Sequence, residues 1–239
     1  MKPILQSRHT ARLLFAWILL SALGIASAPQ MVSALLPFFA DTLNSMSPKF
    51  YRYLKVTNLQ GNPLLEITAV IRDPIRVTNT LVIPSGKTFT ASIHVLHVMV
   101  PIIILFTLLC AWPTSRIQER IRLLLFGIPV NFIILGITIP ALLEGHIEMQ
   151  LNSMIHSAGG VRGNLFLLNW VVFVEMGGLW LFPIIGALAC HIAAREIENL
   201  SQSFISSGIK TLGKKKATRK EHQTKAISGS AIHSSSDHN

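Results

Sequence analysis

Four long apolar runs constrain what this chain can fold into. They cover residues 13–36, 93–112, 121–143 and 165–193. Each is about as long as the ~20 residues with which an α-helix crosses ~30 Å of hydrocarbon. Half of the 239 residues are hydrophobic and only 13% are charged, whereas about 25% are charged in an ordinary soluble domain. The sequence therefore predicts an all-α membrane protein with four transmembrane helices.

The first apolar run has two interpretations. Ala26 and Ala28 flank Ser27 in a pattern typical of the cleavage site of a secretory signal. Pro29 would then follow the cut directly, where proline blocks cleavage, and the apolar character continues to residue 36. We therefore expect an uncleaved span over residues 13–36, kinked near Pro29. A cleaved signal is the alternative.

Residues 37–91 are less hydrophobic and contain short runs typical of strands. These runs lie at residues 50–56, 65–71 and 76–83. The stretch 58–63, Asn-Leu-Gln-Gly-Asn-Pro, is rich in turn residues, so the first two runs are expected to form a hairpin. We therefore predict a small β-type extracytoplasmic module between the first and second transmembrane helices.

The basic residues predict the orientation of the spans. The formal charge is +10, from 21 Lys and Arg against 11 Asp and Glu. With the N-terminus inside, 14 of the basic residues are cytoplasmic and 7 are external, as the positive-inside rule requires. The segments 1–12, 113–120 and 194–239 would then be cytoplasmic and 144–164 an external loop. This predicts a multi-pass protein of the cell inner membrane with both termini in the cytoplasm.

The C-terminal tail, residues 194–239, is strongly basic and is expected to be partly disordered. Its basic cluster would contact anionic lipid headgroups. The cluster consists of Lys214, Lys215, Lys216, Arg219 and Lys220. Aromatic residues do not alternate with these charges, so no nucleic-acid partner is expected.

Glu175 is the most unusual polar residue of the sequence, because it lies ten residues into the fourth apolar run. An unpaired carboxylate is costly there and is a functional hypothesis by default. Gly178 and Gly186 follow on the same helical face, where small residues allow another helix to approach. The candidate partners for its side chain are His94, His97, Asn131 and Asn169. Such a group could be a proton-sensitive pair or a docking site for a partner helix, but a buried tie between helices is favoured.

Residues for catalysis or metal binding are harder to find. Glu144, His146, Glu148 and His156 are metal-ligand types, but they lack the HExxH spacing, and a solvated polar loop is the favoured interpretation. Cys190 and its neighbour His191 point about 100° apart on a helix, which is poor geometry for a nucleophile and its base. We expect no catalytic residues, no metal and no cofactor, and a protein that is not an enzyme.

The order of these segments resembles the small membrane proteins encoded beside exosortases. The resemblance is carried by residues 113–129, with the core TSRIQERIRLLLFGIP, and by residues 173–183, FVEMGGLWLFP. It implies a non-catalytic accessory protein whose membrane partner is an exosortase-like, multispanning transpeptidase. The alternative is a small transport or membrane-assembly component, in which Glu175 and the histidines line a polar path. An enzyme acting on lipid has the least support.

Overall fold

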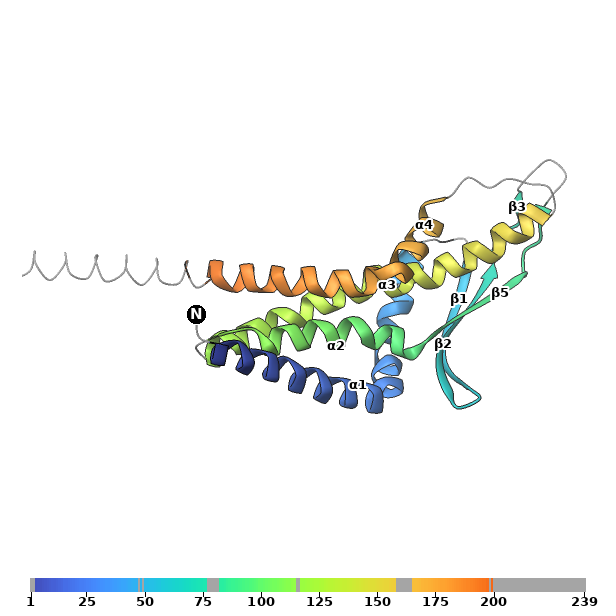
Figure 1. Ribbon diagram of the computed structural model, residues 1–239. Coiled ribbons are helices and arrows are strands. Elements are labelled where there is room, and N and C mark those ends of the chain that lie inside the picture. Colours follow the sequence, from blue (N-terminus) through green and yellow to red (C-terminus); the bar gives the residue numbers. More distant parts are fainter. Residues whose placement is uncertain are drawn as a thin grey trace, which may run out of the picture. The chain divides into compact units, whose positions relative to one another are not determined.

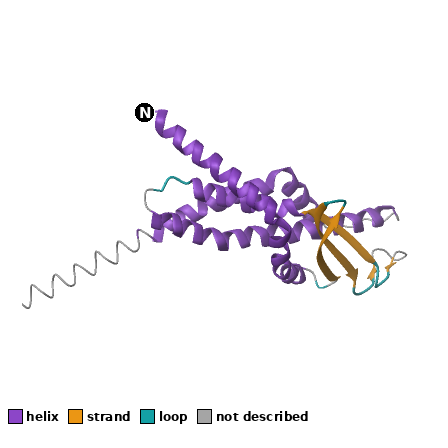
Figure 2. Cartoon of the chain, turned by 90° about the horizontal axis from the view of Figure 1, so that it is seen from below, coloured by secondary structure: helices purple, strands orange, loops and turns teal. Residues whose placement is uncertain are grey.

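The computed structural model describes residues 3–46, 48, 50–76, 82–114, 117–157, 165–197 and 199. These residues are mostly helical, with a small antiparallel sheet that follows the first helix (Figure 1, Figure 2). The chain divides into two compact units, residues 1–191 and 192–239. The sheet and the contacts described below belong to the first unit.

Within the described part of the chain, three helices are long and apolar enough to cross a membrane. They are Thr10–Met46, Ile117–Ser157 and Phe166–Ile197, with 37, 41 and 32 residues. Helix α2, Val95–Ala111, is apolar but has only 17 residues, or about 26 Å at ~1.5 Å per residue. The three long helices indicate a membrane protein, and the predicted fourth span rests on the shorter helix α2.

Helix α1, Pro3–Met46, continues well past the predicted end of the first span. Residues 37–46 were expected to belong to the β-type module, and they are helical instead. Phe39 and Leu43, one turn apart, are both fully buried, so packing of this face offsets the cost of Pro37 inside the helix. The helix changes direction along its length (Figure 1), which is the usual effect of an internal proline such as Pro29.

The two parts of α1 contact different helices. Gly24 lies against α2, because a Cβ there would come within 3.0 Å of Ile103 Cδ1. Farther along, Phe38 packs edge-on against Phe132 of α3, with ring centroids 5.4 Å apart. The bend therefore lets the part of α1 around Gly24 pack on α2 and the part around Phe38 pack on α3.

The sheet has the strand order β1-β2-β5 and is antiparallel throughout. Strands β1, Phe50–Leu59, and β2, Asn62–Ile71, form the predicted hairpin. Gln60 and Gly61 make its two-residue turn with φ values of 53° and 86°. Positive φ at both positions fits the right-handed twist of a hairpin, and glycine adopts it without strain.

The third strand of the sheet is not the predicted one. It is β5, Thr88–His94, whereas the described residues among 75–83 form a separate two-residue pairing of β3, Ile75–Arg76, with β4, Val82–Ile83. The alternation in β5 is clear, since Phe89, Ala91 and Ile93 are buried and the residues between them are exposed. Because β5 leads directly into α2, the helix begins at Val95 and not at residue 93.

Helix α3, Ile117–Ser157, includes residues 144–157, which were predicted to belong to a loop; residues 158–164 of that prediction lie outside the described residues. The helix continues without a break to Ser157, so its 41 residues extend over about 60 Å, twice the thickness of the hydrocarbon layer. Ile147, Leu151 and Ile155 are fully buried at a spacing of four residues. They join the inward face of the sheet in one core, and this packing keeps the segment helical beyond the apolar run.

The last described helical stretch starts as α4, Leu165–Phe173, and continues as a π-helical segment, η1, Val174–Gly178. Regular helix then resumes and reaches Ile197. Gly177 has a φ of 143°, a conformation that residues with a side chain rarely adopt. Glu175 thus lies in an irregular turn inside an apolar helix, a feature that is frequent at functional sites.

Candidate functional site

Five consecutive residues of α3, Glu144–Glu148, contact the sheet on one side and the last helix on the other. We call this segment the α3 junction. Glu144 and Glu148 are 2% and 7% exposed, although both were expected in a solvated loop. Buried charges must be paired and hydrogen-bonded, so the contacts of the α3 junction define the candidate site.

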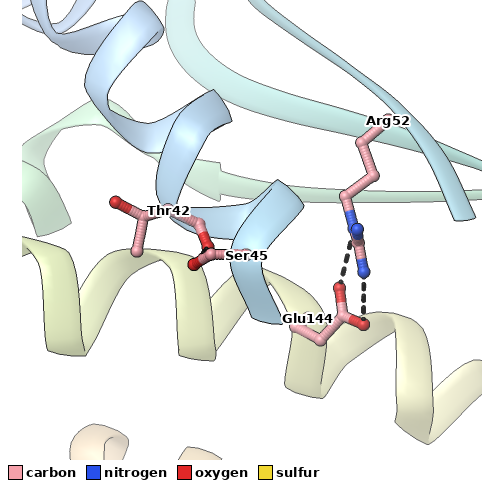
Figure 3. Close-up of polar contacts among 4 residues, drawn as sticks. All are labelled: Thr42, Ser45, Arg52 and Glu144. Carbon is pink, nitrogen blue, oxygen red and sulfur yellow. Dashed lines mark hydrogen bonds and ion pairs between the residues drawn. The ribbon is translucent and has the colours of Figure 1, made fainter. Parts of the chain in front are cut away.

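Arg52 and Glu144 form a closed ion pair between β1 and α3 (Figure 3). The guanidinium donates two hydrogen bonds, from Nε to Oε2 at 3.1 Å and from Nη2 to Oε1 at 2.8 Å. The side chains are 1% and 3% exposed. This two-pronged geometry is the strongest form of an Arg–carboxylate contact, and it fixes the sheet to the helix at one point.

Figure 3 also draws two hydroxyl residues at the end of α1, Thr42 and Ser45. Thr42 Oγ1 donates to the Phe38 carbonyl at 2.9 Å, and Ser45 Oγ donates to the Thr42 carbonyl at 2.6 Å. Both hydroxyls therefore satisfy carbonyl groups of their own helix. The carboxylate of Glu144 is held by Arg52.

A second contact between the sheet and α3 lies outside the core. Gln150 Nε2 donates to the Thr90 carbonyl of β5 at 2.7 Å. β5 is an edge strand of the sheet, so the bond uses a carbonyl of the outermost strand. This exposed hydrogen bond joins the sheet to α3 in addition to the closed ion pair.

Gly145 allows the backbones of α3 and α4 to approach closely. A Cβ at this position would overlap the Val171 side chain and lie 3.2 Å from the Leu167 carbonyl oxygen. The backbone oxygen cannot move away as the end of a side chain can. Any larger residue at position 145 would therefore push the two helices apart.

His146 and Glu175 meet across this close approach. His146 Nε2 lies 3.4 Å from Glu175 Oε1. The other ring nitrogen, Nδ1, lies 2.9 Å from the Leu142 carbonyl of the same helix. Because a carbonyl oxygen only accepts, Nδ1 carries a proton.

The proton on Nδ1 decides the chemistry of the pair. With Nδ1 protonated, neutral His146 presents a lone pair at Nε2, which faces the lone pairs of the Glu175 carboxylate. A hydrogen bond between Nε2 and Glu175 Oε1 therefore requires a proton between these two atoms, either on Nε2, which gives an ion pair, or on the carboxyl group, which gives a neutral pair.

Glu175 is only partly covered by this contact. Its side chain is 53% exposed, against 28% for His146. Some large apolar residues near it on the same helix are exposed, including Met176 at 84% and Trp180 at 60%. Glu175 thus contacts His146, and about half of its side chain remains exposed.

The partners predicted for Glu175 are corrected by this geometry. Neither His94 nor His97 forms an ion pair with Glu175 among the residues that the structure describes. His94 Nδ1 instead accepts a hydrogen bond from Leu96 N at 3.2 Å and caps α2, and His97 is exposed. Strand β5 ends at His94 and α2 begins directly after it, so both histidines lie near the start of α2.

The two predicted asparagines have different surroundings. Asn131 is 8% exposed in α3, and its side-chain oxygen has no hydrogen-bond partner within the described part of the chain. Asn169 is exposed on α4. Neither takes the place of His146 beside Glu175.

Sequence reasoning missed Arg52 and assigned His146 to a loop. Arg52 is 92 residues from Glu144 along the chain, and no local pattern relates them. One signal was present, because Arg52 shares a strand face with Phe50 and Leu54, which face the core. An arginine on the inward face of a strand needs a buried partner.

The basic cluster predicted to contact lipid headgroups lies outside the described residues. It comprises Lys214, Lys215, Lys216, Arg219 and Lys220. Among the described residues, no group of three or more His, Cys, Asp or Glu side chains could hold a metal ion. Comparison with protein-family models, curated proteins and solved structures finds no match to this chain.

Proposed function

We propose that this chain is a non-catalytic accessory protein of the cell inner membrane that docks a partner membrane protein through the surface around Glu175. The observation that carries the proposal is the half-exposed Glu175 carboxylate on an otherwise apolar helix. In a bilayer this surface meets either lipid or protein, and a carboxylate facing lipid is costly. A hydrogen-bond donor from another polypeptide removes that cost.

The proposal includes an arrangement of the spans in the membrane. Helix α2 serves as the fourth span, at about 26 Å, and the bias of basic residues places both termini in the cytoplasm. The sheet would then lie outside the cytoplasm. The α3 junction would connect this outer sheet, through Arg52 and Glu144, to the docking surface, through His146 and Glu175.

The resemblance to proteins encoded beside exosortases supplies the class of partner. We infer a multispanning, exosortase-like transpeptidase, and a role for this chain in protein sorting. The chain itself contributes the docking carboxylate and the sheet, and the partner contributes the chemistry.

The test is co-purification in a mild detergent from native membranes. Wild type is compared with Glu175→Gln, which keeps the size and polarity of the side chain but removes its charge. Glu119→Gln, in the first turn of α3, is the matched control. The proposal expects a multispanning Cys/His transpeptidase with wild type and the control, and its loss with Glu175→Gln.

Two results would contradict the proposal. Equal recovery of the partner with all three proteins would show that the carboxylate plays no part in docking. A chain that purifies alone in every case would instead favour the alternative of a self-contained transport or assembly component.

A further inference from the structure

An apolar groove runs along α1 where this helix packs against α2 and the start of α3. Its first part is a cavity of about 350 Å³ lined by residues that include Arg12, Phe15, Cys110 and Arg120. The second part is a cavity of about 300 Å³, bounded by α1 and α2. Leu20 lines both parts, so they are neighbouring sections of one groove.

Both charged residues of the groove lie in its first part. Arg12 and Arg120 are its two basic residues, and all its other lining side chains are apolar or cysteine. Arg120 Nε is buried and has no hydrogen-bond partner, as far as the structure describes the chain. Two guanidinium groups without a carboxylate in the lining, at one end of an apolar groove, form a site for an anion with an apolar tail.

The length of the groove fits the bilayer. Arg12 lies in the first cavity and Met31 lines the second. The helix between them rises about 28 Å at ~1.5 Å per residue, close to the ~30 Å of the hydrocarbon layer. Arginines at the end of a span lie at headgroup level, so an acyl chain that starts there can follow the groove inward.

We propose that this groove is a specific binding site for an anionic glycerophospholipid. The phosphate contacts Arg12 and Arg120, and one acyl chain lies along Phe15 and Leu20 toward the second cavity. Basic pockets between transmembrane helices are suited to anionic headgroups. A peptide is a poor occupant because its backbone polar groups would stay unsatisfied against apolar walls. The site is independent of the docking surface at Glu175.

The experiment measures lipid retained by the full chain, by native mass spectrometry after release from nanodiscs of equal phosphatidylglycerol and phosphatidylcholine. Wild type is expected to retain phosphatidylglycerol preferentially. The double variant Arg12→Gln/Arg120→Gln is expected to lose this preference by about thirty-fold, which corresponds to about 1 kcal/mol for each charge at 1.4 kcal/mol per tenfold. Arg122→Gln, on the same helix but outside the groove lining, is the control.

Two further arms separate the lipid from a free anion. Leu20→Trp fills the groove where its two parts meet, so it should reduce retention of phosphatidylglycerol while both arginines remain. Inorganic phosphate and glycerol phosphate, which have no acyl chain, should not displace the lipid. If the double variant fails to fold, the single variant of the exposed Arg12 replaces it, with an expected loss of about five-fold from one charge.

Any one of four outcomes would overturn the proposal. Equal lipid preference in wild type and the arginine variants would remove the headgroup site. An equal loss with Arg122→Gln would assign the effect to general surface charge. Displacement by inorganic phosphate, or full retention in Leu20→Trp, would show an anion site without an acyl-chain groove.

Discussion

Glu144 belongs to the α3 junction and Glu175 contacts it from the last helix, and the two carboxylates differ in how completely they are covered. Glu144 is 3% exposed and accepts two hydrogen bonds from Arg52, whereas Glu175 is 53% exposed and faces His146 at 3.4 Å. A closed pair of this kind holds two parts of the chain together. A half-open one leaves an acceptor for another molecule. Under the proposed function, Glu144 is a structural contact and Glu175 is the docking group of the same site.

The largest expected effect comes from breaking the closed pair. Glu144→Ala leaves the Arg52 guanidinium buried without its carboxylate, which costs about 3–5 kcal/mol. The measurement is denaturant unfolding of the purified chain in mild detergent. Arg52→Met/Glu144→Leu removes both charges and should lie closer to wild type than the single variant. A loss below about 1 kcal/mol for Glu144→Ala, the range of an exposed pair, would mean that this pair is not closed.

A smaller loss is expected where α3 and α4 approach each other. Gly145→Ala places a methyl group against Val171 and the Leu167 carbonyl and should cost about 1–3 kcal/mol through overpacking. Gly136→Ala on the same helix is the matched control, because its Cβ would meet only the tip of the Phe38 ring, at 3.0 Å. Hydrogen exchange of the α4 amides is the measurement. Faster exchange in Gly136→Ala than in Gly145→Ala would contradict this packing.

The exposed tie between α3 and the sheet should matter less. Gln150→Ala removes the hydrogen bond from Nε2 to the Thr90 carbonyl, which is worth about 0.5–1.5 kcal/mol. The same unfolding measurement applies, with Gln150→Glu as a second variant that cannot donate. A loss as large as that of Glu144→Ala would assign the main attachment of the sheet to the exposed bond.

The smallest effect on stability is expected at Glu175. Glu175→Gln can donate its amide hydrogen to His146 Nε2, so the contact survives and unfolding should change by no more than about 1 kcal/mol. Loss of the partner without loss of stability is the pattern of a docking group. A destabilisation similar to that of Glu144→Ala would mean that Glu175 mainly holds two helices together, which is the alternative to a docking role.

The helices and the hairpin could be predicted because they depend on local sequence patterns. The apolar runs predicted the helices, and the turn residues at 58–63 predicted the hairpin of β1 and β2. Glu175 was identified because a carboxylate interrupts an apolar run. These features depend on spacing within about 20 residues, which a single sequence displays.

The errors arose where distant residues decide the structure. Glu144, Gly145 and His146 look like a polar loop, but they contact Arg52 and Val171, which are far away in the sequence and which no local pattern relates to them. The partner of Glu175 was misassigned for the same reason. His94 and His97 lie in an apolar run, yet β5 and the start of α2 determine where they lie.

The most direct test of docking through the Glu175 carboxylate is photo-crosslinking in native membranes. A photoreactive amino acid replaces Met176, which is 84% exposed beside Glu175, and in a control replaces Leu125, which is 61% exposed on α3. Docking through Glu175 predicts a protein adduct from position 176 that disappears with Glu175→Gln, and only lipid adducts from position 125. Lipid adducts alone from both positions would contradict the account.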